Sequence, residues 1–195
     1  MPLSSEYWNT RYLENDFGWD AGEITTPLKT YFDQLKDKSI QILIPGAGNS
    51  YEAEYLFNMG FKNVFVLDFA EAPLKNIKTR CKDFPSSQLI QDDFFSHKGQ
   101  YDLVVEQTFF CAIHPDLRSA YAKHIHALLK PKGKLVGVLF NTVFDKAGPP
   151  FGGNKEEYLK YFSPYFEFKT FERCYNSIKP REGNELFINL VKIEY

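Results

Sequence analysis

Two glycines and one carboxylate are the residues whose types and spacing point most clearly to chemistry. Gly46 and Gly48 follow the apolar run 41–45, and Asp68 ends a second apolar run that begins at Val64. Glycines without a Cβ allow a tight turn and the close approach of a ligand. A carboxylate about twenty residues further on, at the end of the next strand, can accept hydrogen bonds from two ribose hydroxyls. The spacing therefore predicts a pocket for an adenosine-containing compound.

The glycine turn differs from that of a dinucleotide site. A third glycine, which permits close helix–strand packing at such a site, is expected near position 51, where this chain has Tyr51. S-adenosylmethionine has no pyrophosphate, so its loop need only hold a methionine carboxylate and amine. The departure at Tyr51 favours S-adenosylmethionine over a dinucleotide.

A pair of acids, Asp92 and Asp93, precedes Phe94 and Phe95 just after the third apolar run. An acid here can accept a hydrogen bond from an adenine amino group, and Phe94 can pack on the ring and offer its backbone N–H. A solvated turn is the alternative, but the position at a strand end favours the binding role.

Aromatic residues are concentrated near the start of the chain. Both tryptophans, Trp8 and Trp19, lie with Tyr7 and Tyr12 in the segment before the first strand. An aromatic flap can close over a cationic sulfonium, with a cation–π attraction of about 0.5–2 kcal/mol. A helix whose tryptophans simply pack on the domain is the alternative.

Alternating strands and helices are expected to position these residues. Apolar runs predict strands at about 40–45, 63–68, 87–91, 101–106 and 134–140, and helical patterns separate them at about 50–60, 71–83 and 116–130. The segment 130–134 is expected to end a helix at Pro131 and to turn at Gly133. A short helix near 155–162 and two runs at 165–175 and 185–193 predict a terminal antiparallel hairpin. The fold class is therefore α/β, with a Rossmann-like, doubly wound, seven-stranded, mostly parallel sheet of the kind associated with class I methyltransferases.

The composition is that of one globular domain. The 195 residues carry a net charge of −2, which does not favour nucleic acid or an anionic membrane. No apolar run is as long as a membrane span, the N-terminus lacks a signal peptide, and three scattered cysteines indicate reduced thiols. We expect a cytoplasmic, single-domain protein (1–195, with an N-terminal lid segment and helix at 1–39 and a core at 40–195), either a monomer or a weak homodimer.

These motifs resemble the thiopurine S-methyltransferase family, most closely its halide/thiol methyltransferase branch. The likeness extends through the segment 106–118 and through the tail motifs at 148–151 and 180–183. It implies S-adenosylmethionine as cofactor, S-adenosylhomocysteine as product, and cofactor contacts at Trp8, Tyr12, Trp19, Gly46, Gly48, Asp68, Asp93, Phe94 and Gln107. Tyr12 stands where family members often have tryptophan. Gln107 and Phe151 replace tyrosines of the halide/thiol branch and so remove two hydroxyls near the expected acceptor site.

The acceptor is expected to be a small soft nucleophile: a thiol, hydrosulfide, halide or thiopurine. Phe109 and Phe110 follow the fourth strand at its carboxyl end, where ligands of open α/β sheets bind. Phe151 is a further lining candidate, and Arg181 can hold an anionic acceptor, although a solvated arginine is the alternative. In-line methyl transfer to such an acceptor needs no strong base, so no catalytic base is assigned.

Other constellations have weaker support. His124 and His126 are two residues apart on the expected helix and so do not share a face. Cys111 and His114 are three residues apart, but there is no second Cys/His pair to complete a metal site. No metal site is therefore expected. Two alternative functions stay open. A NAD-dependent oxidoreductase on a Rossmann-like sheet would bind NADH, and a non-catalytic adenosine-binding or partner-binding domain would bind without turnover.

Overall fold

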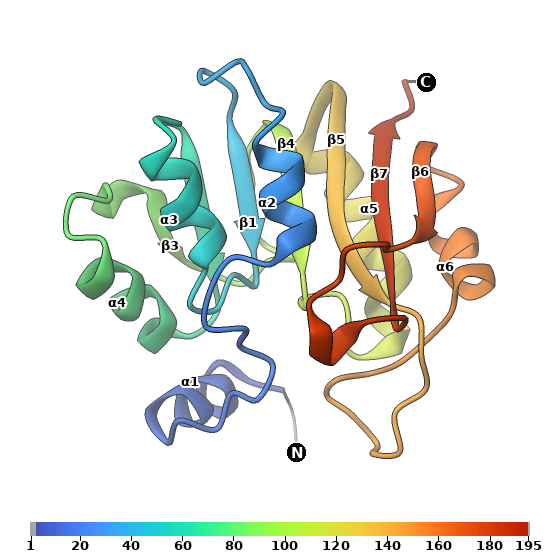
Figure 1. Ribbon diagram of the computed structural model, residues 1–195, viewed down its shortest axis with the longest axis horizontal. Coiled ribbons are helices and arrows are strands. Elements are labelled where there is room, and N and C mark those ends of the chain that lie inside the picture. The colour runs from blue at the N-terminus through green and yellow to red at the C-terminus, as the bar shows by residue number, and fades with distance from the viewer. Residues whose placement is uncertain (1–2, 195) are drawn as a thin grey trace. The chain divides into compact units, whose positions relative to one another are not determined.

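The computed structural model describes residues 3–194 and has a mixed seven-stranded sheet with strand order β3-β2-β1-β4-β5-β7-β6. Residue contacts divide the chain into two compact units, 1–97 and 98–195. Each unit alternates strands with helices, as the sequence predicts (Figure 1).

The first unit contains three parallel strands. Its elements are α1 (Ser5–Leu13), α2 (Thr26–Phe32), β1 (Ile42–Pro45), α3 (Tyr51–Asn58), β2 (Val64–Asp68), α4 (Glu71–Arg80), η1 (Ser86–Gln88) and β3 (Leu89–Gln91). Strand β2 pairs in parallel with both β1 and β3. The apolar run of β1 is buried along its whole length, which explains why it forms an inner strand.

The carboxyl ends of these three strands lie at one edge. Ala47 donates to the carbonyl of Leu67 (3.2 Å), and Asp92 donates to the carbonyl of Asp68 (3.2 Å). The loops that follow β1, β2 and β3 therefore lie next to one another. Helix α1 packs beside α4, close to the loop that follows β2 (Figure 1).

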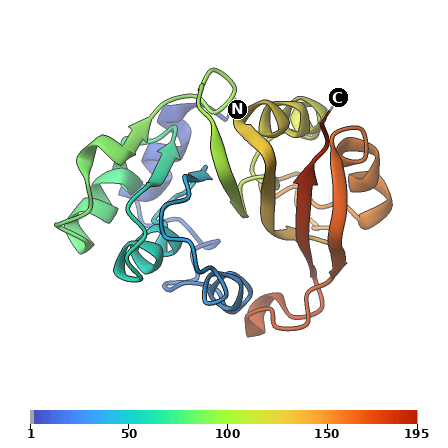
Figure 2. The same cartoon turned by 90° about the horizontal axis from the view of Figure 1, so that it is seen from above.

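The second unit contains the predicted hairpin. Its elements are β4 (Tyr101–Gln107), η2 (Pro115–Leu117), α5 (Arg118–Leu128), β5 (Leu129–Phe140), α6 (Lys155–Phe162), β6 (Phe166–Arg173), η3 (Lys179–Arg181) and β7 (Glu185–Lys192). Strands β4 and β5 are parallel, whereas β7 is antiparallel to both β5 and β6. Figure 2 shows β5, β7 and β6 side by side, and α5 and α6 pack against each other beside them.

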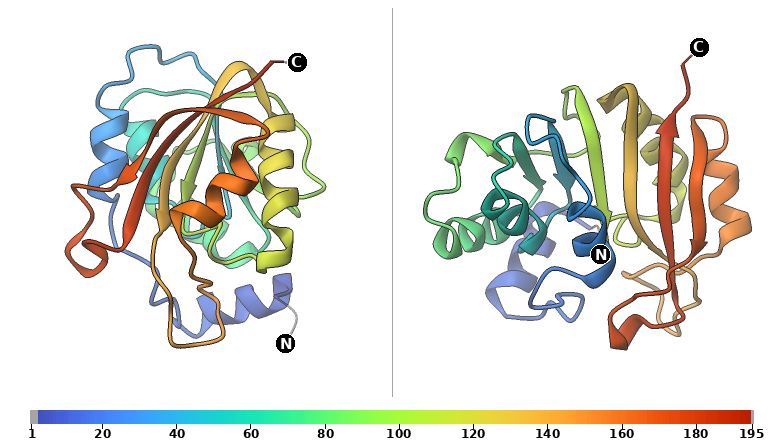
Figure 3. Two further views of the ribbon diagram at one scale, coloured as in Figure 1. Left: turned by 90° about the vertical axis from the view of Figure 1, so that its right-hand side faces the viewer. Right: turned by 45° about the horizontal axis from the view of Figure 1, so that its top comes forward.

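Three loops of the second unit leave its strands at the same end. They are the segment after β4, the long connection from β5 to α6, and the turn from β6 to β7 that contains η3 (Figure 3). Backbone hydrogen bonds join them, because Phe151 donates to Cys111 O (2.7 Å) and Asn141 donates to Asn184 O (2.7 Å). The acceptor candidates from sequence all lie on these loops.

The prediction for segment 130–134 was wrong in detail. Helix α5 ends at Leu128, before Pro131, and the segment belongs to β5, where the pairing with β4 shifts register. The left-handed backbone is found at Lys132 (φ 62°) and not at Gly133. Gly133 is needed for space, because a Cβ there would lie 2.8 Å from the carbonyl oxygen of Lys130.

Within residues 3–194, no helix has both the length and the apolar character needed to cross a bilayer. The same residues contain no group of three or more His, Cys, Asp or Glu side chains able to hold a metal ion. Cys81, Cys111 and Cys174 are free thiols, and the last two are buried.

Candidate active site

The predicted glycine loop and carboxylate meet in the first unit. Gly46 (φ 55°) and Gly48 (φ 53°) both adopt the left-handed conformation that favours glycine. Asp68 is 8% exposed, and its Oδ2 accepts a hydrogen bond from the Gly48 N–H at 2.8 Å. Its Oδ1 accepts from the Ala70 N–H, also at 2.8 Å. One side chain therefore fixes the loop after β1 to the loop after β2.

Burial raises the pKa of Asp68 to about 6, and the backbone N–H donors of Ala70, Gly48 and Phe69 oppose part of that rise. The carboxylate is therefore mostly ionised at neutral pH. An ionised carboxylate has two oxygens and about four lone-pair sites, so it can accept hydrogen bonds from a ligand as well as from the backbone.

The N-terminal aromatic residues cover the glycine loop. Trp19 Nε1 donates to the Tyr12 hydroxyl (3.2 Å), and the Trp8 and Trp19 rings meet edge to face at 5.5 Å between centroids. A Cβ on Gly48 would clash with the Tyr12 hydroxyl, so a side chain there would displace the tyrosine as well as adopt an unfavourable φ. Burial, followed by the negative charge of Asp68, raises the pKa of Tyr12 well above its ordinary value. The Arg11 guanidinium lies 4.8 Å from the Trp19 centroid, so this ring already contacts a cation.

A chain of polar side chains ties the aromatic segment to the loop, and sequence reasoning gave it no role. Asp20 Oδ2 accepts from Asn49 Nδ2, and Asn49 Oδ1 accepts from Asn76 Nδ2 at 2.9 Å. The Arg80 guanidinium donates to the backbone carbonyl of Asn49. Asn49 lies directly after the second glycine, and that position was the available signal for a role in the loop.

The acidic turn after β3 is tightly organised. Asp93 Oδ1 accepts from the Phe95 N–H (3.0 Å), and Asp92 Oδ1 accepts from the Asp93 N–H (2.8 Å). Phe94 is only 5% exposed and meets the Phe95 ring edge to face. Phe94 is therefore buried in the core of the unit, whereas the Asp93 side chain is exposed, so the adenine-binding role of this turn stays a prediction.

The residues of this unit fit an adenosine-containing cofactor. The loop has two glycines with positive φ, an adjacent buried carboxylate with further acceptor capacity, and the Tyr12 phenol against Gly48. The indole rings of Trp19 and Trp8 pack next to that phenol in turn. These groups match the hydroxyls, amine and sulfonium of S-adenosylmethionine.

The second unit holds the acceptor candidates and Gln107. Gln107 is the last residue of β4, and Thr108 follows it with a left-handed backbone (φ 60°). Phe109 is partly exposed, whereas Phe110 is 1% exposed and packs among the rings of Tyr121, Tyr158 and Phe162. Of the two phenylalanines, Phe109 is therefore the one whose surface a ligand can reach.

Phe151 and Arg181 lie on the two neighbouring loops. Besides its backbone bond to Cys111, Phe151 meets the His114 ring edge to face at 5.5 Å. Arg181 is 8% exposed, and its guanidinium lies 3.5 Å from the Glu185 carboxylate, so the alternative of a solvated arginine is wrong. Its positive charge acts on the Cys111 thiol. Phe151 is thus joined by a hydrogen bond to the segment after β4, and the Arg181 guanidinium lies 5.7 Å from the ring centroid of Phe140 at the end of β5.

Two buried charged residues, Glu106 and Arg118, hold these loops. Glu106 is 0% exposed, and Arg118 is 1% exposed. Sequence reasoning gave neither a role. The available signals were a carboxylate at the end of an apolar strand and an arginine at the start of a helix.

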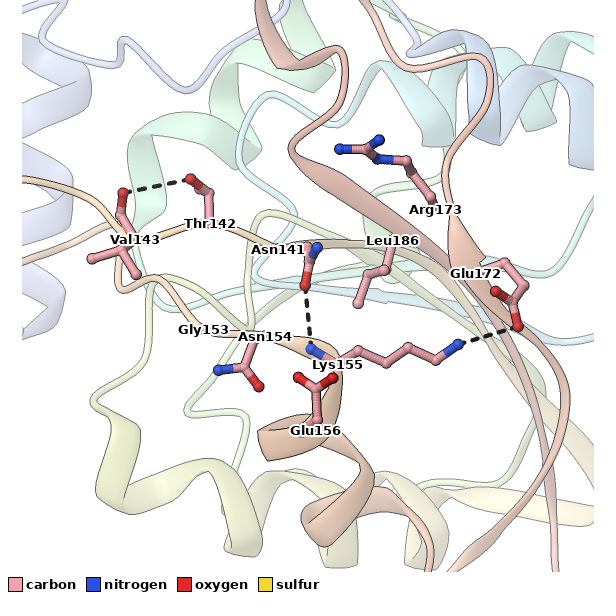
Figure 4. Close-up of a pocket in the computed structure, with 10 residues that line it drawn as sticks. All are labelled: Asn141, Thr142, Val143, Gly153, Asn154, Lys155, Glu156, Glu172, Arg173 and Leu186. Carbon is pink, nitrogen blue, oxygen red and sulfur yellow. Dashed lines mark hydrogen bonds and ion pairs between the residues drawn. The ribbon is translucent and has the colours of Figure 1, made fainter.

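A surface cavity of about 520 Å³ lies elsewhere in the second unit (Figure 4). Lys155 crosses it to pair with Glu172 at 3.1 Å, and its backbone N–H donates to Asn141 Oδ1. The cavity is lined by Asn141, Thr142, Val143, Gly153, Asn154, Lys155, Glu156, Glu172, Arg173 and Leu186. None of the site residues expected from sequence is among them.

Comparison with known proteins agrees with this geometry. The model of the thiopurine S-methyltransferase family matches residues 3–190. The chain belongs to the thiopurine S-methyltransferase family. The family resemblance, the methyltransferase class and the cofactor, S-adenosylmethionine, are thereby confirmed.

Relatives occur in plants and bacteria. The chain is 26% identical over 188 residues to a probable thiol methyltransferase 2 of Arabidopsis thaliana, covering 93% of this chain and 83% of that one. It is 24% identical over 192 residues to a thiopurine S-methyltransferase of Pseudomonas aeruginosa, covering 88% and 87%. Both relatives are therefore matched over most of their length.

Solved structures confirm the fold class. The magnesium protoporphyrin IX methyltransferase of Synechocystis, with bound S-adenosylhomocysteine, superposes with a TM-score of 0.76 at 12% identity, covering 97% of each chain. The 1,6-didemethyltoxoflavin-N1-methyltransferase of Burkholderia thailandensis gives a TM-score of 0.75 at 17% identity, covering 97% of this chain and 87% of that one. The predicted seven-stranded class I methyltransferase fold is correct.

Proposed function

We propose that this protein transfers a methyl group from S-adenosylmethionine to a small soft nucleophile: a thiol, hydrosulfide, halide or thiopurine. The observation that carries the proposal is the buried Asp68 carboxylate at the end of β2, hydrogen-bonded to the Gly48 N–H of a left-handed glycine loop. The matched family is one of methyltransferases, which does not support the alternative of a NAD-dependent oxidoreductase. A site for the pyrophosphate of NAD would also favour a glycine at position 51, where this chain has Tyr51.

On the cofactor side, each residue has a distinct task. Asp68 accepts hydrogen bonds from ribose hydroxyls, and Asp93 accepts from the adenine amino group. Phe94, which is 5% exposed, anchors the turn that presents Asp93. Trp8 and Trp19 place aromatic rings where the sulfonium is held, with an attraction of about 0.5–2 kcal/mol. When bound, S-adenosylmethionine supplies an electrophilic methyl group carried by that sulfonium.

On the acceptor side, Phe109 and Phe151 line the pocket and exclude water, Gln107 contacts the cofactor, and Arg181 holds an anionic acceptor. A thiolate, hydrosulfide or halide is already nucleophilic, so the residues orient it and need not remove a proton. Cys111 is no competitor as a nucleophile, because burial raises the pKa of its thiol to about 12.

The relatives support the acceptor class. Their names include a probable thiol methyltransferase, thiocyanate methyltransferases and thiopurine S-methyltransferases. Gln107 and Phe151 lack the hydroxyls of the halide/thiol branch that the sequence resembles. For that reason the acceptor screen includes aromatic thiols beside iodide and hydrosulfide.

The setting of the reaction is part of the proposal. The net charge of −2 and the three scattered cysteines support a cytoplasmic enzyme that acts on small molecules and not on nucleic acid or a membrane surface. We expect one domain, present as a monomer or a weak homodimer, and light scattering of the purified protein measures that state directly.

Calorimetric titration with S-adenosylmethionine, with NADH as comparison, tests the cofactor. We expect binding of S-adenosylmethionine and none of NADH, followed by labelled-methyl transfer to at least one acceptor of the screen. Asp68→Ala should bind the cofactor far more weakly, because it leaves ribose hydroxyls unpaired in a partly buried site. Asp83→Ala is the matched control, since Asp83 is exposed. Wild-type affinity in Asp68→Ala would overturn the ribose assignment, and NADH binding alone would overturn the function.

A further inference from the structure

The Glu106 carboxylate organises the segment that follows β4. Its Oε1 accepts hydrogen bonds from the backbone N–H groups of Phe109 (2.8 Å) and Phe110 (2.9 Å). Its Oε2 accepts from the hydroxyl of Tyr121 on helix α5. A side chain with no exposed surface therefore fixes the direction in which the chain leaves the strand.

The segment that Glu106 holds is strained. Thr108 has φ 60°, a conformation that β-branched residues adopt rarely. Such backbone persists only where surrounding contacts fix it. The two N–H groups that follow Thr108 are those bound by Glu106, so the carboxylate supplies these contacts.

Arg118 does the same for the loop that carries Phe151. Its Nη2 donates to the carbonyl oxygens of Phe151 (3.1 Å) and Gly152 (2.9 Å), and its Nη1 pairs with Glu157 at 2.8 Å. The guanidinium also lies 4.9 Å from the Phe110 ring centroid. One buried cation thus ties the 151–152 turn to α5, α6 and the aromatic core.

We propose that Glu106 and Arg118 are positioning residues that set acceptor affinity and selectivity by fixing the two loops that present Phe109 and Phe151. This inference rests on the proposed function, because it assumes that those two rings line the acceptor pocket. Neither charged side chain contacts a reacting atom. Both act through backbone groups that only a rigid, buried hydrogen-bond partner can hold in place.

Conservative and disruptive variants separate positioning from general stability. Glu106→Gln keeps a carbonyl oxygen able to accept from both N–H groups, whereas Glu106→Ala does not. Arg118→Lys keeps the charge but loses the fork by which Nη2 reaches the two carbonyls while Nη1 pairs with Glu157. Thr108→Gly relieves the strained backbone and loosens the segment without emptying the core. Asp102→Asn is the control, since it removes a surface ion pair with Lys130 and touches neither loop.

The measurements are acceptor KM and kcat for hydrosulfide and for an aromatic thiol, the calorimetric Kd for S-adenosylmethionine, and Tm. We expect Arg118→Lys and Glu106→Ala to raise acceptor KM roughly tenfold or more and to change the ratio between the two acceptors. Glu106→Gln and Asp102→Asn should stay near wild type. Cofactor Kd should be unchanged in Arg118→Lys, because Arg118 contacts Phe151, Gly152 and Glu157 and not Gln107. Thr108→Gly should raise acceptor KM without lowering Tm, which keeps the test valid if Glu106→Ala fails to fold.

The inference fails if Arg118→Lys and Thr108→Gly leave acceptor KM and the acceptor ratio unchanged while the wild type binds cofactor and turns over. It also fails if cofactor Kd rises in parallel with acceptor KM in Arg118→Lys, because that marks general loosening of the fold. Absence of cofactor binding by the wild-type protein overturns the proposed function, and this inference with it.

Discussion

At the scale of single residues, Asp68 combines a structural and a binding task. Its two oxygens accept from the Gly48 and Ala70 N–H groups, which fixes the loops after β1 and β2. Asparagine has only one acceptor oxygen, so it would leave one of these two N–H groups facing an amide donor. The position therefore favours a carboxylate even before a ligand is considered.

Cofactor affinity should depend on pH through Asp68. The pKa of this carboxyl is raised by burial to about 6, and ribose hydroxyls bind to the ionised form. Affinity should therefore be constant above about pH 7 and fall by up to about tenfold per pH unit below the pKa. Calorimetry between pH 5 and pH 8 measures this dependence. Asp83→Ala should follow the same curve, and a flat profile in the wild type would contradict the assignment.

Gly48 and Tyr12 are packed so closely that a side chain at position 48 would clash with the Tyr12 hydroxyl. Gly48→Ala creates that clash and also demands a positive φ, which costs roughly 1–2 kcal/mol in an L-residue. In a Tyr12→Phe background the hydroxyl is gone, so the same substitution should cost less. Urea unfolding of the four proteins in this cycle measures the coupling.

Gly18→Ala is the control for that cycle. Gly18 has no positive φ, and a Cβ there meets nothing within 4 Å, so the free energy of unfolding should hardly change. Equal costs for Gly48→Ala with and without the Tyr12 hydroxyl would show that the two groups do not compete for space.

At the scale of elements, helix α1 supplies a cap that helix α4 lacks. The N-cap of α4 is Ala70, which has no side-chain acceptor. Asn9 of α1 provides one, since its Oδ1 accepts from the Ala72 N–H at 2.9 Å, and Ser5 Oγ donates to Phe69 O at 2.8 Å. Capping α4 therefore holds the aromatic N-terminal segment beside the loop after Asp68.

Asn9→Ala should loosen that attachment. Loss of a helix cap costs about 0.5–2 kcal/mol, and here the loss should also weaken cofactor binding because Trp8 and Tyr12 are carried by α1. Thermal unfolding and calorimetry measure the two effects. Asn63→Ala is the matched control, since Asn63 Nδ2 donates to Ser39 O (2.7 Å) away from α1. If both variants weaken cofactor binding equally, the cap has no special role.

At the scale of the whole molecule, we expect the two compact units to unfold as one domain. The family model spans residues 3–190 and so covers both units. Trp8 and Trp19 are the only tryptophans of the sequence, so tryptophan fluorescence reports on the first unit, whereas far-ultraviolet circular dichroism reports on both. The two urea transitions should coincide. Separate midpoints would show two independently stable domains.

Much of the fold was accessible from periodicity. Every predicted strand and helix is present, because runs such as 42–45 and 64–68 are apolar enough to be inner strands and glycine or proline separates them. The segment 130–134 was harder. The helix ends before Pro131, and the segment joins β5 at a register shift in its pairing with β4, which the local turn residues do not encode.

The sequence by itself determined the glycine loop, the acid at the end of the next strand and the aromatic N-terminal segment, because strand ends and turn residues are local properties of the chain. Only the tertiary structure decided that Phe110 is core while Phe109 is accessible, that Arg181 is buried against Glu185, and that the Tyr12 hydroxyl occupies the space over Gly48. The structure alone also showed that Glu106 accepts from the Phe109 N–H and that Arg118 donates to the Phe151 carbonyl. Burial and hydrogen-bond partnership join residues far apart in the chain, and no local pattern encodes which of them will meet.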